Sequence, residues 1–277
     1  RAMISRNAAA IKVPGNERAG WRMGVNVSPG YSSYAVKHGN DYASNMTQVA
    51  NDGNANVSGG VAIRYNTSRR WSLESGIYYA QNGKQAGSSP QVYGSREQAL
   101  YSAAPERLYF NTAVTMETSG VAMNSIAGVI EIENMPAGAE IAADLENAGF
   151  YGNSLITQGE LSQVFDLVEI PLYLRYLLVD SNLDVELLGG INAGVIVGNQ
   201  AFLENQFGVQ RIGRTRDIST MNFSGALGLA FSYALGKNFS LGVEPRFNYY
   251  MTSISRNPEV DFRPYRIGVY TGLYYSF

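Results

Sequence analysis

The chain has 277 residues, a formal net charge of -2 at pH 7 and no cysteine. This charge gives no basic surface for nucleic acid, and the absence of cysteine excludes disulfides and thiolate metal sites. The sequence has no run of 18 or more apolar residues, which is the length that a membrane-spanning helix requires. The 30 glycines and 19 tyrosines favour strands and turns over a helical bundle.

The N-terminal segment, residues 1–18, is polar and lacks the charged-then-apolar layout of a signal peptide. If the protein is exported, we expect a further segment upstream of Arg1.

Eight segments then alternate large apolar side chains with small or polar ones. A period of two over this length is typical of strands with one face in an apolar medium. Seven of them begin near Trp21, Val57, Trp71, Val164, Leu183, Met221 and Phe239, and the eighth is Tyr265–Phe277. Each is long enough for the roughly 9 to 11 residues with which a tilted strand crosses a bilayer core.

The connections between these segments alternate in length. Three are tight turns rich in Asn, Asp, Ser or Gly, at residues 66–70, 180–182 and 234–238. Four are longer, at residues 29–56, 82–163, 198–220 and 252–264. Short turns at one end and long loops at the other are the arrangement of outer-membrane barrels.

The second long connection, residues 82–163, is too large for a plain loop. It contains two strand-like segments that we expect to pair, Leu108–Val114 and Gly128–Glu133. Apolar residues at i, i+4 suggest a short helix within Pro136–Ala148. We interpret the segment as an extracellular cap that extends the barrel wall, and a ligand-binding lid is the alternative.

Side-chain size indicates which face of the strands is outside. One face carries large apolar residues such as Ile77, Leu172 and Leu227, which are too voluminous for the interior of an eight-stranded barrel. The other face is rich in glycine and alanine, which suits a crowded lumen. A sheet in lipid has to close, because lipid cannot satisfy an open edge.

The predicted fold is therefore all-β, an eight-stranded antiparallel up-and-down transmembrane β-barrel with short periplasmic turns and long extracellular loops. We expect residues 19–277 to form the barrel in the outer membrane, with residues 82–163 as a long extracellular insertion and residues 1–18 as a periplasmic segment.

The small-residue face also holds five arginines and five carboxylates, spread over seven strands. In chain order they are Arg22, Arg64, Glu74, Glu169, Arg175, Asp184, Glu186, Glu244, Arg246 and Arg266. Every cation is arginine, whose planar fork pairs with carboxylates away from bulk water. Because the charges cancel, we interpret them as structural ion pairs of a closed lumen. A paired-carboxylate active site or an ion-selective pore is the alternative.

Two prolines, Pro171 and Pro245, lie inside proposed strands, where each removes a ladder hydrogen bond. We expect β-bulges to absorb them.

We predict no catalytic, cofactor-binding or metal-binding residues. His38 is the single histidine, and its only conceivable catalytic arrangement is with Ser32 or Ser33, as in a lipid-modifying barrel enzyme. The glycines Gly189, Gly190 and Gly194 continue a strand and open no helix, so they are not a dinucleotide fingerprint.

Four segments resemble the outer-membrane β-barrel domain of Bacteroidetes that is often called PorT-like. They are Trp71–Gln81 (WSLESGIYYAQ), Glu169–Tyr176 (EIPLYLRY), Leu241–Tyr249 (LGVEPRFNY) and Gly272–Phe277 (GLYYSF). The Ile-Pro-Leu of the second segment is the most specific element, and Pro171 is part of the family pattern. The likeness covers about residues 20 to 277 apart from the long second loop.

This resemblance implies a small barrel like OmpA or OmpX in architecture, with Phe277 as a C-terminal aromatic that the barrel-assembly machinery reads. It implies no catalytic residues. We therefore expect a non-enzymatic protein in the outer membrane of a Gram-negative bacterium, whose partners are membrane lipid, the assembly machinery and an extracellular ligand that the residues do not identify. A passive pore, a lipid-modifying enzyme and a soluble lipocalin-like carrier are the alternatives.

Overall fold

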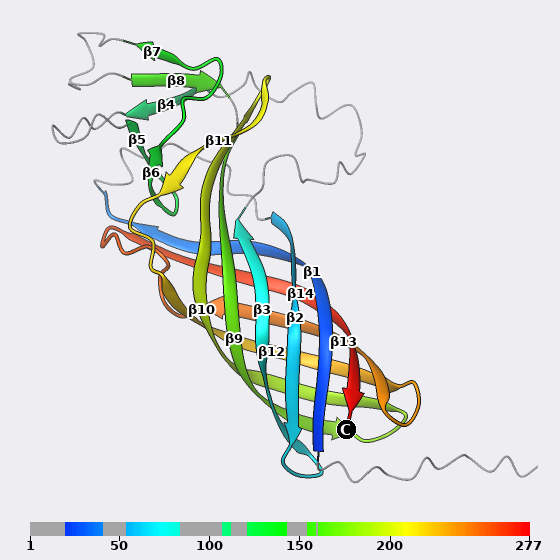
Figure 1. Cartoon of the computed structure of the whole chain (residues 1–277). Coiled ribbons are helices and arrows are strands. Elements are labelled where there is room, and N and C mark those ends of the chain that lie inside the picture. Colours follow the sequence, from blue (N-terminus) through cyan, green and yellow to red (C-terminus); the bar gives the residue numbers. More distant parts are fainter. Residues whose placement is uncertain (1–19, 41–53, 84–106, 112–120, 143–153, 159) are drawn as a thin grey trace, which may run out of the picture.

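The computed structural model describes residues 20–40, 54–83, 107–111, 121–142, 154–158 and 160–277. In these ranges, antiparallel strands form an 11-stranded sheet and a 3-stranded sheet (Figure 1). No helix in the described ranges is long and apolar enough to cross a membrane.

Eight strands of the larger sheet close into a barrel. They are β1 (Gly20–His38), β2 (Asn54–Asn66), β3 (Trp71–Gly83), β9 (Glu160–Val179), β10 (Leu183–Asn205), β12 (Met221–Ala234), β13 (Phe239–Tyr250) and β14 (Val260–Ser276). Each barrel strand pairs with the next one along the chain, and β14 pairs with β1 to complete the ring. The predicted fold class is confirmed, and all eight strands lie where the dyad repeat placed them.

The three tight turns also lie where they were predicted, between β2 and β3, between β9 and β10, and between β12 and β13. They gather at the end of the barrel where the chain ends (Figure 1). The four long connections are shorter than predicted, because the strands continue beyond the membrane pattern. β1 runs through Pro29 to His38, β10 runs to Asn205, and β14 already begins at Val260.

At the opposite end, the barrel sheet continues into an extension formed by three shorter strands. Beyond the barrel, β10 pairs with β11 (Gly208–Thr215), which pairs with β6 (Gly128–Ile132), and β6 pairs with β5 (Val121–Ser125). In Figure 1 this extension rises above the barrel wall. The smaller sheet contains β4 (Arg107–Asn111), β8 (Ser154–Gln158) and β7 (Glu140–Ala142).

Two expectations for the second long connection are wrong. The segments around Leu108 and Gly128 do not pair with each other, since β4 pairs with β8 while β6 pairs with β5 and β11. Residues 140–142, which we expected in a short helix, form strand β7 instead. The backbone of this short stretch is extended by its pairing with β8, which overrides the helical spacing of its apolar residues. Residues 143–148 lie outside the described ranges.

The outer face of the barrel is apolar, as side-chain size predicted. Large hydrophobic residues such as Ile77, Leu172 and Leu227 are exposed around the barrel wall. Aromatic pairs gather near the turn end, including Trp21 with Tyr65 and Trp71 with Tyr176, whose ring centroids are 4.9 and 4.7 Å apart. An apolar belt flanked by aromatic side chains is the surface that a bilayer requires.

Both prolines remain inside regular strands, so the expected β-bulges at these positions are wrong. The β3–β9 ladder lacks pairs beside Pro171 and the β12–β13 ladder lacks pairs beside Pro245, yet neither ladder changes register there. The Ser75 hydroxyl donates to the carbonyl oxygen of Pro171 at 2.8 Å. Each proline therefore interrupts one ladder locally while the strand continues.

A charge on the lipid-facing belt should destabilise the barrel. Leu227 lies at the middle of β12 with 64% of its surface exposed, and Leu235 lies in the following turn with 56% exposed. We expect Leu227→Arg to lower the free energy of unfolding from lipid by about 2–4 kcal/mol, and Leu235→Arg by about 0–1 kcal/mol. Equal small losses for the two variants, measured by urea titration in vesicles, would contradict a bilayer around β12.

Candidate functional site

The candidate site is a network of six charged side chains that crosses the lumen. Alternate residues of each barrel strand point inward, and this register brings together Arg64 of β2, Glu74 of β3, Arg175 of β9, Glu186 of β10, and Glu244 and Arg246 of β13. All six are buried. We call these six residues the ion-pair layer.

Arg175 and Arg64 connect the carboxylates of the ion-pair layer. Arg175 lies 2.9 Å from Glu74, 2.9 Å from Glu186 and 2.6 Å from Glu244, measured between nitrogen and carboxylate oxygen. Arg64 lies 3.0 Å from Glu74, 2.9 Å from Glu186 and 3.7 Å from Glu244. Each of these two arginines therefore contacts all three glutamates, and three positive charges balance three negative ones.

Arg246 completes the layer and is surrounded by aromatic rings. Its guanidinium pairs with Glu244 and lies 3.4 Å from Glu74. The guanidinium carbon also lies 4.4 to 5.6 Å from three ring centroids, which belong to Tyr78, Tyr173 and Tyr270. Ring faces at this distance attract a cation, so the tyrosines replace part of the solvation that Arg246 loses on burial.

Glycines in neighbouring strands make room for a fourth lumen tyrosine. The Tyr274 hydroxyl donates to Glu244 at 3.0 Å. A Cβ added to Gly24 would lie 2.2 Å from the Tyr274 ring, and one added to Gly242 would lie 2.8 Å from it. These two glycines are thus required for the close approach of a large ring in a narrow lumen.

A second ion pair lies farther along the lumen, toward the extracellular end. Arg266 of β14 donates to Glu169 of β9 at 2.7 Å, and also to the Asn82 side-chain oxygen at 3.3 Å. The Tyr250 hydroxyl donates to Glu169 at 3.0 Å and accepts from Asn82 at 3.1 Å. This closed circuit joins four strands across the lumen.

The remaining two predicted charges lie near the turn end of the barrel. The Arg22 guanidinium donates to the Ser276 hydroxyl at 3.2 Å. Asp184 accepts a hydrogen bond from the backbone N–H of Ser181 at 3.3 Å. The structure thus brings eight of the ten predicted residues into two ion-pair groups, the ion-pair layer and the Arg266–Glu169 pair, whereas Arg22 and Asp184 bind neighbours at the rim.

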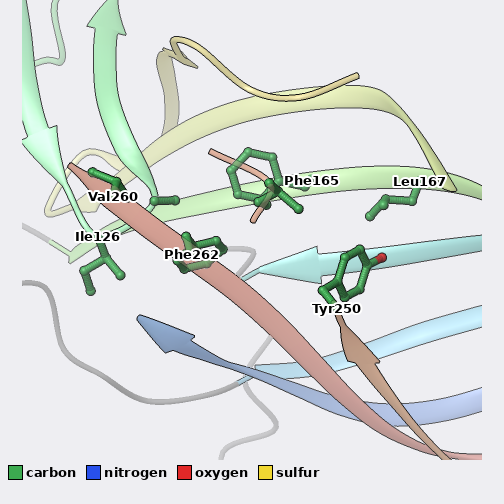
Figure 2. Packing of buried hydrophobic residues seen from close by; sticks show 8 residues of the cluster. Ile126, Phe165, Leu167, Tyr250, Val260 and Phe262 are labelled. Carbon is green, nitrogen blue, oxygen red and sulfur yellow. The ribbon is translucent and has the colours of Figure 1, made fainter. Parts of the chain in front are cut away.

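An apolar cluster fills the lumen at the extracellular end. It consists of Ile126, Ala127, Phe165, Leu167, Tyr250, Ile254, Val260 and Phe262, and Figure 2 shows how these side chains converge from separate strands and loops. Ile126 and Ala127 belong to the turn between β5 and β6, so the second long connection supplies part of the cluster. We call these eight residues the apolar plug.

The acid–base arrangement considered for His38 is not assembled. Its Nε2 lies 2.9 Å from the carbonyl oxygen of Ile126 in the apolar plug. His38 and Ser33 both belong to β1, five positions apart, which separates them by roughly 16 Å in an extended strand. Ser32 is buried and one position farther. Among the described residues no group of His, Asp and Glu side chains could hold a metal ion.

Sequence reasoning missed Tyr250, Asn82 and the apolar plug. A signal for the plug exists in β9 and β14, where the inward positions change from charged to apolar. In β9 the inward series after Glu169 continues with Leu167 and Phe165, while Asp166 lies on the other face. This inversion of polarity marks the point where a strand leaves the bilayer. No such sequence pattern indicates that Ile126 belongs to the apolar plug.

A closed antiparallel barrel with an apolar outer belt and a charged, filled lumen defines an outer-membrane β-barrel protein. A family model, outer membrane protein beta-barrel domain, matches residues 14–256. The chain belongs to this family and lies in the outer membrane.

Solved structures of other outer-membrane barrels are similar to this chain at low identity. Neisserial surface protein A is 10% identical, with 94% of this chain and 98% of that chain covered and a TM-score of 0.41. The outer membrane protease OmpT from Escherichia coli is 8% identical, with 93% and 97% covered and a TM-score of 0.39. The attachment invasion locus protein Ail of Yersinia pestis is 10% identical, with 92% and 99% covered and a TM-score of 0.31.

No curated protein matches the chain.

Removing one charge from the ion-pair layer should be far more harmful than removing a surface charge. Arg246→Ala leaves buried carboxylates uncompensated, so we expect a loss of about 3–5 kcal/mol in the free energy of unfolding. Arg211 lies 3.1 Å from Glu133 on the exposed extension, and Arg211→Ala should cost about 0–1 kcal/mol. Denaturant unfolding in detergent measures both, and similar losses would contradict the role of burial.

Proposed function

We propose that the protein is a non-enzymatic outer-membrane barrel with a closed, ion-paired lumen, whose extracellular extension and loops serve in binding or in envelope structure. The observation that carries this proposal is the ion-pair layer, in which Arg64 and Arg175 each reach three carboxylates from different strands. A solute would have to break several buried charge pairs to pass it. Such pairs are costly to separate, because each ion then loses its partner without regaining water.

Two further features support a closed lumen over a passive pore. Arg266 and Glu169 pair across the lumen beyond the ion-pair layer, and the apolar plug fills the extracellular mouth. An eight-stranded barrel leaves an interior only wide enough for side chains. The ion-pair layer, the Arg266–Glu169 pair and the apolar plug therefore occupy the lumen one after another along its length. A lipid-modifying enzyme has no support from His38, whose ring contacts a plug carbonyl.

The extracellular extension supports the binding or structural role. β9 and β10 pair with each other up to Glu160 and Glu204, well beyond the belt, and β11 and β6 add to the same sheet. Across β11 and β6, Arg211 and Arg214 pair with Glu131 and Glu133 on the exposed face. Strands joined in this way form a continuous, ion-paired scaffold outside the bilayer, which supports a role in binding or in envelope structure.

We also propose the finer assignments made from the sequence. The Ile-Pro-Leu segment at residues 170–172 supports membership in the PorT-like group of Bacteroidetes. Residues 1–18 are proposed as a periplasmic segment, residues 19–277 as the barrel and residues 82–163 as its extracellular insertion. The proposed partners are membrane lipid and the barrel-assembly machinery, together with an extracellular ligand.

A closed lumen predicts that the wild-type protein does not conduct ions. The refolded protein in a planar bilayer should show no steady conductance of the size of an open porin, because the ion-pair layer and the apolar plug block the same path. Insertion of the folded barrel should be checked by its heat-modifiable migration on gels, with an OmpA-type barrel as the reference. Stable porin-sized currents from correctly folded protein would overturn the proposal and favour the passive pore.

Phe277 is proposed as the assembly signal. Its backbone N–H donates to the carbonyl oxygen of Trp21 at 3.0 Å and its side chain is 72% exposed beside Tyr275. Deleting Phe277 should reduce the yield of folded barrel in cells, whereas spontaneous refolding into detergent should change little, because the ring contributes little buried surface. The control is Phe239→Ala, which removes another aromatic ring that packs against Tyr275. Unchanged yield in cells after the deletion would remove the signalling role.

A further inference from the structure

We infer that the extracellular mouth of the barrel is a binding site for a small, uncharged apolar molecule, and that the turn between β5 and β6 occupies this site in the structure. Two residues of the apolar plug, Ile126 and Ala127, belong to that turn, which we call the plug turn. The inference rests on the closed lumen proposed above, because a ligand at a mouth that leads to a closed lumen binds there and does not pass through.

The other six plug residues, which we call the mouth residues, belong to barrel strands or to the loop between β13 and β14. They are Phe165, Leu167, Tyr250, Ile254, Val260 and Phe262. The backbone N–H of Ile254 donates to the carbonyl oxygen of Phe262 at 3.0 Å, and the Ile254 oxygen accepts from the N–H of Ser219 in the loop between β11 and β12 at 2.8 Å. These contacts hold the mouth residues in place without the plug turn.

The plug turn reaches the mouth from the extension. It is the tip of the β5–β6 hairpin, and β6 joins the barrel sheet through three residue pairs with β11. Gly128, with a φ of 141°, allows the chain to reverse after the turn. His38 Nε2 lies 2.9 Å from the Ile126 carbonyl oxygen, and the Arg216 N–H donates to the Val129 carbonyl oxygen at 2.7 Å. The turn is thus docked on the mouth by two apolar side chains and by hydrogen bonds to its backbone.

The rest of the hairpin is held by a different set of contacts. Ile130 and Ile132 of β6 pack in a separate buried cluster of the extension that includes Leu203 of β10 and Ile212 of β11. This cluster contains none of the mouth residues. The tip of the hairpin can therefore leave the mouth while the core of the extension stays formed.

Withdrawal of the plug turn exposes an apolar surface that has to be covered again. The rings of Phe165 and Phe262, whose centroids are 6.4 Å apart, would then face water (Figure 2). Exposure of apolar area is unfavourable, so the open state is a minor one in the free protein. A molecule that binds only the open state increases its population. The plug turn is thus an autoinhibitory contact with which the ligand competes.

The mouth residues favour a ligand without charge. The Tyr250 hydroxyl is the single polar side-chain group among the eight residues of the apolar plug, and it is already bonded to Glu169 and Asn82. A charged ligand would lose its hydration here without gaining a partner. The ligand replaces the side chains of Ile126 and Ala127, so a short aliphatic or a single-ring aromatic molecule matches the site.

Toluene binding to the protein in lipid nanodiscs, followed by NMR of labelled isoleucine methyl groups, tests this inference. Ile126 reports the plug turn and Ile254 reports the mouth residues. Ile212 is fully buried in the extension, and Ile77 on the barrel wall reports toluene dissolved in lipid. We expect saturable shifts at Ile126 and Ile254, no shift at Ile212 and a non-saturable shift at Ile77. Absence of a saturable shift at Ile254 would overturn the inference.

A disulfide between β6 and β11 tests whether toluene displaces the plug turn. The chain has no cysteine, and Glu131 and Arg214 are cross-strand partners. We expect the oxidised Glu131→Cys, Arg214→Cys variant to bind toluene about tenfold more weakly than its reduced form, because affinity falls with the population of the open state. Equal affinities of the two forms would contradict displacement of the turn.

The matched control is the pair Glu204→Cys and Val209→Cys, which are partners across β10 and β11. Its disulfide crosslinks the extension without fixing β6, so oxidation should leave the toluene affinity unchanged. A loss equal to that of the first variant would show that general stiffening causes the effect, and would overturn the role of the plug turn.

Conductance separates a failure of this inference from a failure of the proposed function. Absence of toluene binding in a non-conducting barrel overturns the apolar site and leaves the closed lumen intact. Porin-sized conductance of the wild type overturns the closed lumen on which the site rests.

Discussion

The mutual pairing of arginine and glutamate inside a barrel of eight strands is the interaction on which this structure depends. Moving an ion out of water costs several kcal/mol even in a relaxed protein, and the ion-pair layer buries six ions together. The cost is offset only because Arg64 and Arg175 each contact three carboxylates and because tyrosine rings surround Arg246. The same pairs join five strands, so the lumen contributes to closing the barrel.

The polarity of the strands inverts where they leave the bilayer. Within the belt, large apolar residues such as Leu172 and Leu227 face outward and charged residues face inward. Beyond it, Phe165 and Phe262 face inward while Arg263 and Asp261 pair on the outer side. Both arrangements have the same cause, because the apolar face of each strand turns away from water. Within the bilayer it faces lipid, and beyond the bilayer it faces the apolar plug. The filled extracellular end is therefore a small protein core built on top of a membrane barrel.

Much of the barrel could be predicted from the sequence because strands that face lipid carry a large apolar side chain at every second position, and this alternation is clear in all eight strands. The starts of all eight strands and the three tight turns follow from that period and from turn residues such as Asn66 and Asp180. The same alternation of side chains places the lumen charges on the inward face of the strands. The strand lengths could not be predicted as well, because β1, β10 and β14 continue where the outward residues become polar.

The partners of the lumen charges could not be predicted, because they depend on the stagger of the strands around the ring. Arg64 of β2 reaches Glu186 of β10, which lies three strands away in the barrel order. No local spacing encodes that approach. The position of the turn that places Ile126 in the apolar plug was harder still to predict. It depends on the pairing of β6 with β11, and no repeating sequence pattern indicates that pairing. The pairing of β4 with β8 was missed for the same reason.

The most direct test of the central interaction is a double-mutant cycle between Arg175 and Glu244, whose charged atoms are 2.6 Å apart. The free energy of unfolding in detergent would be measured for the wild type, Arg175→Gln, Glu244→Gln and the double variant. If the ion-pair layer stabilises the closed barrel, each single variant loses stability and the double variant loses less than their sum, with an interaction energy of about 0.5–3 kcal/mol. Losses that add within about 0.5 kcal/mol would contradict the account.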